Sequence, residues 1–161
     1  MDIHIREYQP GDAAAVRQCV VALQEHERTI DPRLRPGEAM ADAYCEQIHA
    51  RCRRADGKIF VAEQDGVVVG FVAVLARETF KELDEPTGSY AFISDLVVLA
   101  PYRRGGIGRK LLARAEAFAR EAGARELRIG VLARNVEALR LYQAAEFTPH
   151  LEVLAKRITP L

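Results

Sequence analysis

The stretch Asp95–Leu112, which reads DLVVLAPYRRGGIGRKLL, is the segment of the sequence that is most informative about the fold. It begins with apolar and β-branched residues, as a buried strand does, and then passes through a cluster of glycines. After the glycines, apolar side chains recur at the spacing of one helix face. We therefore expect a strand over residues 90–98 that leads through a glycine loop into a helix over residues 106–122.

The glycine loop has the chemistry of an anion site. Its glycines allow the backbone to approach a ligand closely and to adopt positive φ, and the N–H groups at a helix start favour negative charge. Arg103, Arg104 and Arg109 add charge-assisted donors. The loop is therefore predicted to hold a phosphate or pyrophosphate. The simpler alternative is a glycine-rich turn with solvated arginines.

Two other phosphate-binding motifs do not fit this loop. The P-loop pattern G-x-x-x-x-G-K-[ST] is absent from the sequence. A dinucleotide fingerprint needs a third small residue, but Gly106-x-Gly108 is followed by Leu111 at that position. The loop therefore matches neither class of nucleotide site.

The rest of the chain alternates strands and helices without a long linker or a repeat. Asp65-Gly66 is a hairpin signal, so the early strands are expected to be antiparallel. The unit from residue 90 to residue 132 is a βαβ crossover, so its two strands are expected to be parallel. The sequence thus predicts one α/β domain over residues 1–161 with a mixed sheet. Further strands are expected over 3–7, 58–64, 67–76, 126–132 and 151–158, and further helices from Asp12 to about residue 28, around 41–52 and over 135–145.

Composition excludes several classes of protein. Of 161 residues, 23 are basic and 23 acidic, and this zero net charge argues against a dedicated nucleic-acid binder. No run of eighteen apolar residues occurs, so no membrane span is expected, and the N-terminus does not read as a signal peptide. Cys19, Cys45 and Cys52 have the spacing of neither a zinc site nor a disulfide framework. We expect small buried side chains, no metal, and a cytoplasmic location.

Two linked motifs identify a family resemblance. Residues 103–108, Arg-Arg-Gly-Gly-Ile-Gly, match the acetyl-CoA motif [QR]-x-x-G-x-[GA] of the GNAT superfamily. Downstream, Asn135-x-x-Ala138-x-x-x-Tyr142 matches as well. The chain therefore resembles GNAT N-acetyltransferases along nearly its whole length, which implies a mostly antiparallel sheet with one parallel crossover and helices on both faces. One departure is Glu146-Phe147, where many members have Gly-Phe, so the backbone after the last helix is expected to differ.

The resemblance implies acetyl-CoA as cosubstrate and a way of binding it. The pantetheine would lie between the two parallel strands and pair with the backbone like a third strand. The pyrophosphate would lie on the glycine loop, and Asn135 would contact the cofactor, serve as a plain helix cap, or do both. The implied cofactor-binding residues are Leu96, Val97, Val98, Arg103, Arg104, Gly105, Gly106, Ile107, Gly108, Arg109 and Asn135.

The implied reaction is transfer of the acetyl group to a primary amine by direct attack in a ternary complex. A backbone N–H of Val97 or Val98 would stabilise the oxyanion. Tyr142 lies seven residues after Asn135, about two helical turns, so both share one face. Tyr142 is therefore expected to be the catalytic acid that protonates the leaving thiolate; the alternative is a core aromatic.

The general base and the acceptor stay open. Candidates for the base are Ser94 through a relay water, and Glu25, His26 and Glu27 near the end of the first helix. Asp95 is expected to point to the opposite face from Ser94 and to bond nearby loop backbone as a structural carboxylate.

Charge does not choose the acceptor. A basic segment would suit an acceptor that bears a carboxylate or phosphate, whereas an acidic segment would suit a polyamine, an aminoglycoside or a lysine side chain. The oligomeric state, a homodimer included, is left open too. Two rival functions remain: a non-catalytic acetyl-CoA sensor or scaffold, and a nucleotide-binding module that uses the same loop. The basic segment carries Arg28, Arg33 and Arg35, and the acidic one carries Glu78, Glu82, Asp84 and Glu85.

Overall fold

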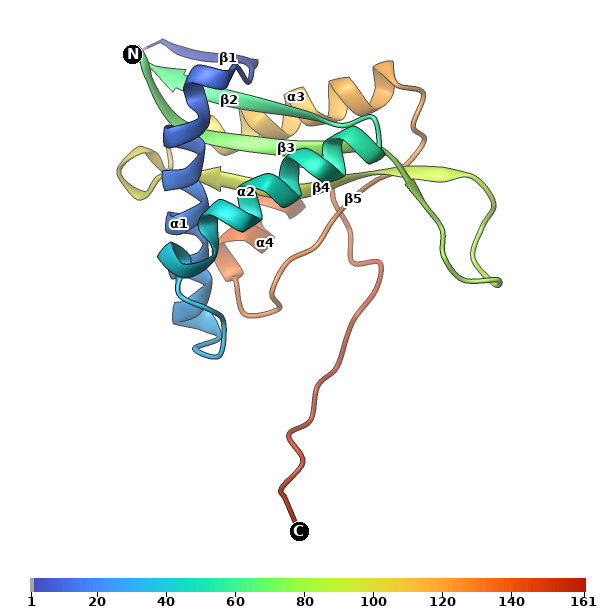
Figure 1. The fold of residues 1–161 in the computed structure, drawn as a ribbon. Helices are drawn as coiled ribbons and strands as arrows, with labels where there is room; N and C mark the ends of the chain where they lie inside the picture. Colours follow the sequence, from blue (N-terminus) through green and yellow to red (C-terminus); the bar gives the residue numbers. More distant parts are fainter. Residues whose placement is uncertain (1) are drawn as a thin grey trace.

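A five-stranded sheet forms the middle layer of the protein in a computed structural model, which describes residues 2–161 (Figure 1). The strands follow chain order across the sheet, and every neighbouring pair is antiparallel except the last, β4 and β5, which is parallel. The predicted mixed sheet with one parallel crossover is therefore confirmed. The strands are β1 (Ile3–Glu7), β2 (Lys58–Gln64), β3 (Val67–Thr79), β4 (Ser89–Val98) and β5 (Leu127–Ile129).

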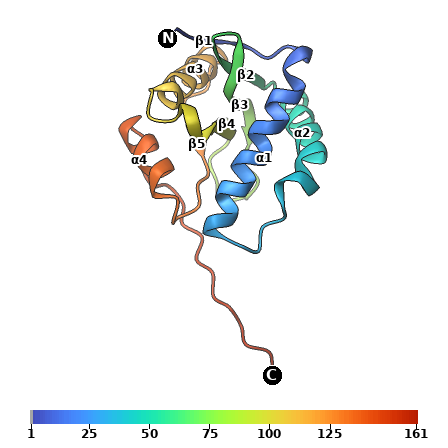
Figure 2. The same cartoon turned by 90° about the vertical axis from the view of Figure 1, so that its left-hand side faces the viewer.

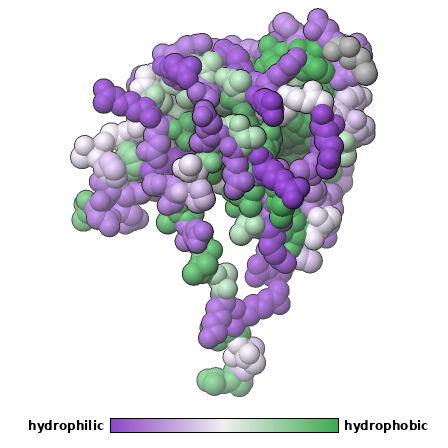
Figure 3. All heavy atoms as spheres, turned by 180° about the vertical axis from the view of Figure 1, so that it is seen from behind, coloured by the Kyte–Doolittle hydropathy of each residue, from purple (hydrophilic) through white to green (hydrophobic). Residues whose placement is uncertain are grey.

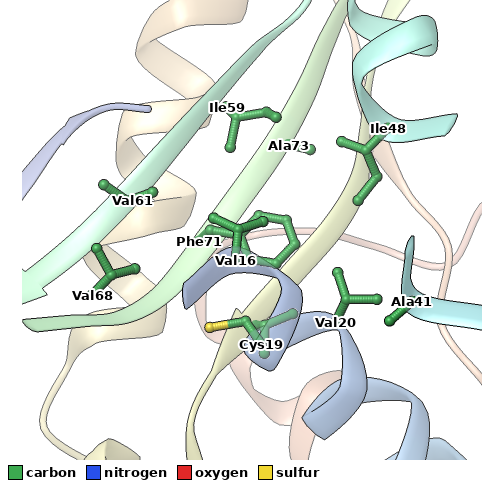
Figure 4. Close-up of a cluster of buried hydrophobic side chains, with 11 residues drawn as sticks. Val16, Cys19, Val20, Ala41, Ile48, Ile59, Val61, Val68, Phe71 and Ala73 are labelled. Carbon is green, nitrogen blue, oxygen red and sulfur yellow. The ribbon is translucent and has the colours of Figure 1, made fainter. Parts of the chain in front are cut away.

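Helices cover both faces of the sheet, as Figure 2 shows in an end-on view. On one face lie α1 (Ala13–Ile30) and α2 (Gly37–Arg54), and on the other lie α3 (Ile107–Glu121) and α4 (Val136–Ala144). Each face has its own core. Phe71 lies at the centre of the cluster under α1 and α2 (Figure 4), and Leu111 belongs to the cluster under α3. Two faces must therefore stay buried for the sheet to hold its shape.

The hairpin turn at Asp65-Gly66 and the start of the first helix at Asp12 both lie where the sequence predicts them. Asp65 and Gly66 have φ of 51° and 78°, the positive values of a tight hairpin turn between β2 and β3. Helix α1 begins after Asp12, but the Asp12 side chain does not cap it. The carboxylate instead accepts bonds from Arg6, at 2.8 and 2.9 Å, and from the backbone N–H of Gln9. Asp12 therefore fixes the start of α1 to β1.

Several boundaries differ from the sequence prediction. Strand β3 runs on to Thr79, three residues beyond its predicted end, and β5 covers only residues 127–129 instead of 126–132. Residues 130–135 form a loop, in which Arg134 donates to the carbonyl oxygen of Ile30 at 2.6 Å. This bond joins the loop after β5 to the end of α1, on the opposite face of the sheet.

The predicted closing strand over 151–158 is wrong. Residues 147–161 form no helix or strand, and residues 148–161 are all exposed. Figures 1 and 3 show this tail leaving the body of the molecule. A strand needs a neighbour to pair its backbone groups, and the extended tail lies away from the sheet. Its large apolar residues are correspondingly uncovered: Leu151, Val153, Leu154 and Ile158 are 80–90% exposed.

Across residues 2–161, none of the helices has the length and apolar character that a membrane span requires, and no group of three or more His, Cys, Asp or Glu side chains could hold a metal ion. The three cysteines are free; Cys19 is fully buried, while Cys45 and Cys52 are half-buried against the same core.

Candidate active site

A β-bulge at Ser94 marks the centre of the site. Ala73 of β3 faces Asp95, and Val74 faces Ile93, which leaves Ser94 as the extra residue. The bulge changes which face successive side chains reach. Ile93 packs in the core under α3, whereas Val97 packs under α1 and α2, although simple alternation would place both on one side.

Strands β4 and β5 separate just beyond this bulge. They pair only over residues 91–93 and 127–129, while β4 continues to Val98. A pocket of about 510 Å³ opens where the pairing stops, a size typical of a small-molecule site. Its walls come from α1, β4, the loop before α3, the end of β5 and α4. Figure 2 shows α1 and α4 on either side of these strands.

The pocket brings together almost every residue predicted to bind the cofactor. Gly105 is the exception, because it does not line the pocket. Val97 lines the pocket, but its carbonyl oxygen points away from it, toward β3. A Cβ added to Gly70 of β3 would lie only 2.4 Å from this oxygen. Pocket-lining residues from the predicted set are Leu96, Val97, Val98, Arg103, Arg104, Gly106, Ile107, Gly108, Arg109 and Asn135.

Backbone orientation distinguishes the residues of β4. The N–H of Leu99 donates to Val69 on β3, so the backbone groups of Leu99 point toward β3. Because these groups alternate along a strand, those of Val98 and Leu96 point to the other side, into the open pocket. Of the two N–H groups considered for the oxyanion, the one on Val98 therefore faces the pocket.

The loop before α3 adopts positive φ at one of its glycines, Gly106, as predicted, and also at Arg104, where φ is 66°. Gly106 precedes the helix with φ of 80°, and the backbone leaves open space where its Cβ would stand. Gly108 is needed for a different reason: a Cβ there would lie 2.9 Å from Leu141 on α4, so it permits close packing of α3 on α4. The first N–H groups of α3 have no partner within the helix and line the pocket end.

The three arginines of this loop and of the first turn of α3 differ in what they contact. Arg103 donates from Nε to the carbonyl oxygen of Val98 at 2.9 Å and so ties the loop to β4. Arg104 and Arg109 are exposed, and within residues 2–161 neither side chain has a hydrogen bond or ion pair. Arg104 and Arg109 are therefore the cations free to meet an anion.

Helix α4 carries the other predicted residues. Asn135 Oδ1 accepts from the N–H of Ala138 at 3.2 Å, so Asn135 caps the helix and lines the pocket at once. Two turns on, Tyr142 also lines the pocket and is 9% exposed. Burial, with a further effect of the Glu27 charge, raises the pKa of Tyr142 to about 12. Its phenol therefore stays protonated at neutral pH.

The end of α4 explains how Glu146-Phe147 replaces Gly-Phe. Glu146 adopts φ of 66°, the left-handed conformation that glycine favours. The N–H of Phe147 donates to Tyr142 and that of Glu146 to Gln143, the two bonds of a Schellman motif. The rings of Phe147 and Tyr142 then pack edge-on at 6.1 Å. The departure thus leaves the turn formed, and the turn supports Tyr142.

The candidates for the base separate clearly in space. Glu25 accepts from the N–H of Gly37 at 2.7 Å and from Arg28, which lowers its pKa, and it does not line the pocket. His26, Glu27 and Ser94 do line it. Burial, then the charge of Asp95, raises the pKa of Glu27 above its ordinary value.

Asp95 was predicted to bond loop backbone, and that prediction is wrong. Its carboxylate accepts from the Tyr44 hydroxyl of α2 and from Ser94 Oγ, each at 2.7 Å. Burial raises the pKa of Asp95 despite these bonds. Nothing in the sequence linked the Tyr44 hydroxyl to a residue 51 positions away.

Four of the seven residues in the two charged segments have local partners. Arg28 pairs with Glu25, and Arg33 pairs with Asp31. In the acidic segment, Glu78 pairs with Arg54, and Glu85 accepts from two backbone N–H groups of its own turn. Neither segment therefore identifies the acceptor.

Comparison with known proteins agrees with the geometry. The acetyltransferase (GNAT) family model matches residues 20–147. An aminoglycoside N(6')-acetyltransferase type 1 from Stenotrophomonas maltophilia is 30% identical over 144 residues, which cover 89% of this chain and 84% of that protein. A thialysine N-epsilon-acetyltransferase from Bos taurus is 30% identical over 145 residues, which cover 88% of this chain and 82% of the relative.

Solved structures show the same fold. The aminoglycoside acetyltransferase AAC(6')-Iy, in complex with a CoA-linked bisubstrate analogue, superposes with a TM-score of 0.71 at 21% identity, over 99% of this chain and 100% of that one. The BH1408 protein from Bacillus halodurans, as a tetramutant, gives a TM-score of 0.83 at 17% identity, over 96% and 99%. The chain therefore belongs to the acetyltransferase (GNAT) family, and it is an N-acetyltransferase whose cosubstrate is acetyl-CoA.

Proposed function

We propose that this protein acetylates a primary amine by direct attack of the amine on acetyl-CoA in a ternary complex, within one domain over residues 1–161. One observation carries the proposal. The pocket between β4 and β5 has the start of α3, with its unpaired N–H groups, at one end and the protonated phenol of Tyr142 beside its apolar walls. Relatives named for acetylating an aminoglycoside and thialysine support an amine as acceptor.

In this proposal the cofactor occupies the pocket from the loop to α4. The pyrophosphate lies on the N–H groups that begin α3, with Arg104 and Arg109 adding positive charge. The pantetheine pairs with the backbone of Leu96 and Val98, whose groups point into the pocket. Asn135 contacts it from α4 while still capping that helix.

The acyl transfer then uses two groups of the chain. The N–H of Val98 donates to the oxygen of the thioester carbonyl as the amine attacks, and it stabilises the oxyanion of the tetrahedral intermediate. When the C–S bond breaks, Tyr142 donates its phenolic proton to the leaving sulfur, so that thiol leaves in place of thiolate. The phenolate regains a proton from solvent before the next turnover.

Release of CoA thiol is the test of this function. The protein is mixed with acetyl-CoA and, in turn, with polyamines, amino acids, amino sugars and peptides, and free thiol is followed over time. Amine-dependent release is expected. Tight acetyl-CoA binding without release by any amine would favour the sensor or scaffold, and competition by NAD or ATP would favour a general nucleotide module.

We also propose that the protein is a homodimer. Strand β5 is the outer strand of the sheet beyond β4, and the tail over 151–158 leaves its apolar residues uncovered. A tail strand added to the β5 edge of a second copy would cover both.

Sedimentation velocity tests the homodimer. Val153→Asp is expected to shift a dimer toward monomer, whereas Leu83→Asp, at an exposed loop position, is not. A monomeric unmodified chain at micromolar concentration contradicts the proposal. We further propose a cytoplasmic location, because all three cysteines are free, and cell fractionation tests it.

A further inference from the structure

Glu27 is a carboxylate that the proposed reaction does not yet use. It lies one turn before the end of α1, lines the pocket, and is only partly exposed. Within the described residues, its side chain has no hydrogen bond and no ion pair, unlike Glu25 two positions earlier, which accepts from Gly37 and Arg28. An unpaired carboxylate in a partly desolvated pocket is costly unless a bound cation compensates it.

The groups around Glu27 make this part of the pocket negative. Asp95 faces it from β4 and Tyr142 from α4, while Tyr44 and Arg51 of α2 lie behind Asp95. His26 and Glu137 line the same pocket, and its arginines all lie in the loop before α3 or in the first turn of that helix, at the proposed phosphate end. The field at Glu27 therefore favours a cation.

We propose that Glu27 binds the ammonium group of an aliphatic amine acceptor and is the general base that removes its proton. This inference rests on the proposed acetyl transfer. The acceptor class is an alkylammonium ion, such as the end of a polyamine, an amino sugar or a lysine side chain. An arylamine, already neutral, would gain nothing from this carboxylate.

The proton balance of the step is complete. The alkylammonium gives one proton to the Glu27 carboxylate, and the freed nitrogen lone pair forms the new C–N bond to the thioester carbon. The intermediate loses its second nitrogen proton to solvent, the C–S bond breaks, and sulfur takes the proton of Tyr142. Glu27 then releases its proton, so ammonium and acetyl-CoA become amide, thiol and one free proton.

Asp95 acts as a positioning residue behind Glu27. The Tyr44 hydroxyl and Ser94 Oγ hold its carboxylate in place at 2.7 Å each. Burial, then the charge of Asp95, disfavours the ionised form of Glu27, so the pKa of Glu27 is raised above its ordinary value. A base whose pKa lies near the working pH transfers protons most effectively.

Glu27→Gln tests the proposal, with Glu25→Gln as the matched control. Each variant is assayed by thiol release from acetyl-CoA, from pH 6 to pH 9, with 1,4-diaminobutane, ethylamine and 2,2,2-trifluoroethylamine, the last being largely neutral over most of this range. For every alkylamine that the unmodified protein acetylates, Glu27→Gln is expected to lower kcat/KM about 10²-fold. Acetyl-CoA affinity and thermal stability should stay unchanged.

The pH profile separates a base from a merely structural residue. In the unmodified protein kcat/KM should stay level while Glu27 is ionised and fall only as the pH drops through the Glu27 pKa, whereas in Glu27→Gln it should rise about tenfold per pH unit across the range as free amine accumulates. The loss should be smaller with trifluoroethylamine. An unaltered rate and profile in Glu27→Gln overturns the proposal for Glu27 alone. No thiol release from the unmodified protein with any amine overturns the proposed acetyl transfer instead.

Discussion

Replacing Tyr142 by phenylalanine removes the proposed proton donor and little else. The ring stays, so the contact with Phe147 at 6.1 Å is kept. No hydrogen bond to the Tyr142 hydroxyl occurs in residues 2–161, so the free energy of unfolding should change by less than about 1 kcal/mol. Acetyl-CoA affinity should not change, because the hydroxyl acts on sulfur only as the C–S bond breaks.

The chemical step should slow by about 10²-fold, which corresponds to about 2.7 kcal/mol of lost transition-state stabilisation. With a pKa of about 12, roughly one phenol in 10⁵ is ionised at pH 7, so Tyr142 is always ready to donate. Tyr142 should therefore cause no loss of activity below about pH 10.

Single-turnover mixing of amine with the acetyl-CoA complex measures this step directly. Product is quantified by rapid quench, so that product release does not hide the chemistry. A Tyr142→Phe variant with the unmodified rate, under conditions where chemistry limits, would refute the role and leave water as the proton source.

Four other predictions follow from the loop and the helix ends. Gly106→Val should weaken acetyl-CoA binding about 100-fold by calorimetry, because φ of 80° is unfavourable for valine and two charge-assisted backbone bonds are lost. Acetyl-CoA affinity should fall with added salt, and less steeply in Arg104→Ala, because that exposed cation is screened. Glu146→Gly should stabilise the protein by about 1 kcal/mol in urea unfolding, because glycine relieves the left-handed conformation. Asp12→Asn should lower the free energy of unfolding by about 2 kcal/mol at pH 7, and by less in acid. The reason is that the bonds from Arg6 lower the pKa of Asp12 in the folded protein to below 3.8. The stabilisation by this carboxylate is therefore complete above about pH 5 and is lost as the pH falls through that folded pKa.

Each of these has a result that contradicts it. Unchanged affinity in a folded Gly106→Val variant would move the pyrophosphate elsewhere, and salt-independent binding would remove the arginines from the phosphate site. A destabilised Glu146→Gly variant would show that packing, and not backbone strain, determines the stability at that position. A loss of unfolding free energy in Asp12→Asn that stays the same in acid would show that packing, and not charge, determines the stability there.

The sequence located the loop and both ends of the pocket because their signals are local. Glycines at a strand-to-helix junction predict positive φ, and Gly106 has it. Helical spacing predicts that Asn135 and Tyr142 share a face, and both line the pocket. Such features depend on residues within two turns of one another, where backbone geometry is fixed by chemistry that the sequence shows directly.

The remaining features depend on contacts between distant residues. The bulge at Ser94 broke the alternation assumed for β4, and so the bond of Asp95 to Tyr44 could not be found by counting. Glu27 could not be chosen over Glu25 until α1 had an orientation against β4. The tail has the composition of a strand, but composition does not predict whether a sheet edge lies close enough for the tail to pair with it.

A crystal structure of the protein with CoA tests the central claim most directly. We expect pantetheine between the separated ends of β4 and β5, paired with Leu96 and Val98. The phosphates should lie on the N–H groups before and within the first turn of α3, and the thiol within hydrogen-bond distance of the Tyr142 hydroxyl. CoA bound elsewhere, or bound in this pocket with its sulfur directed away from Tyr142 and Glu27, would contradict it.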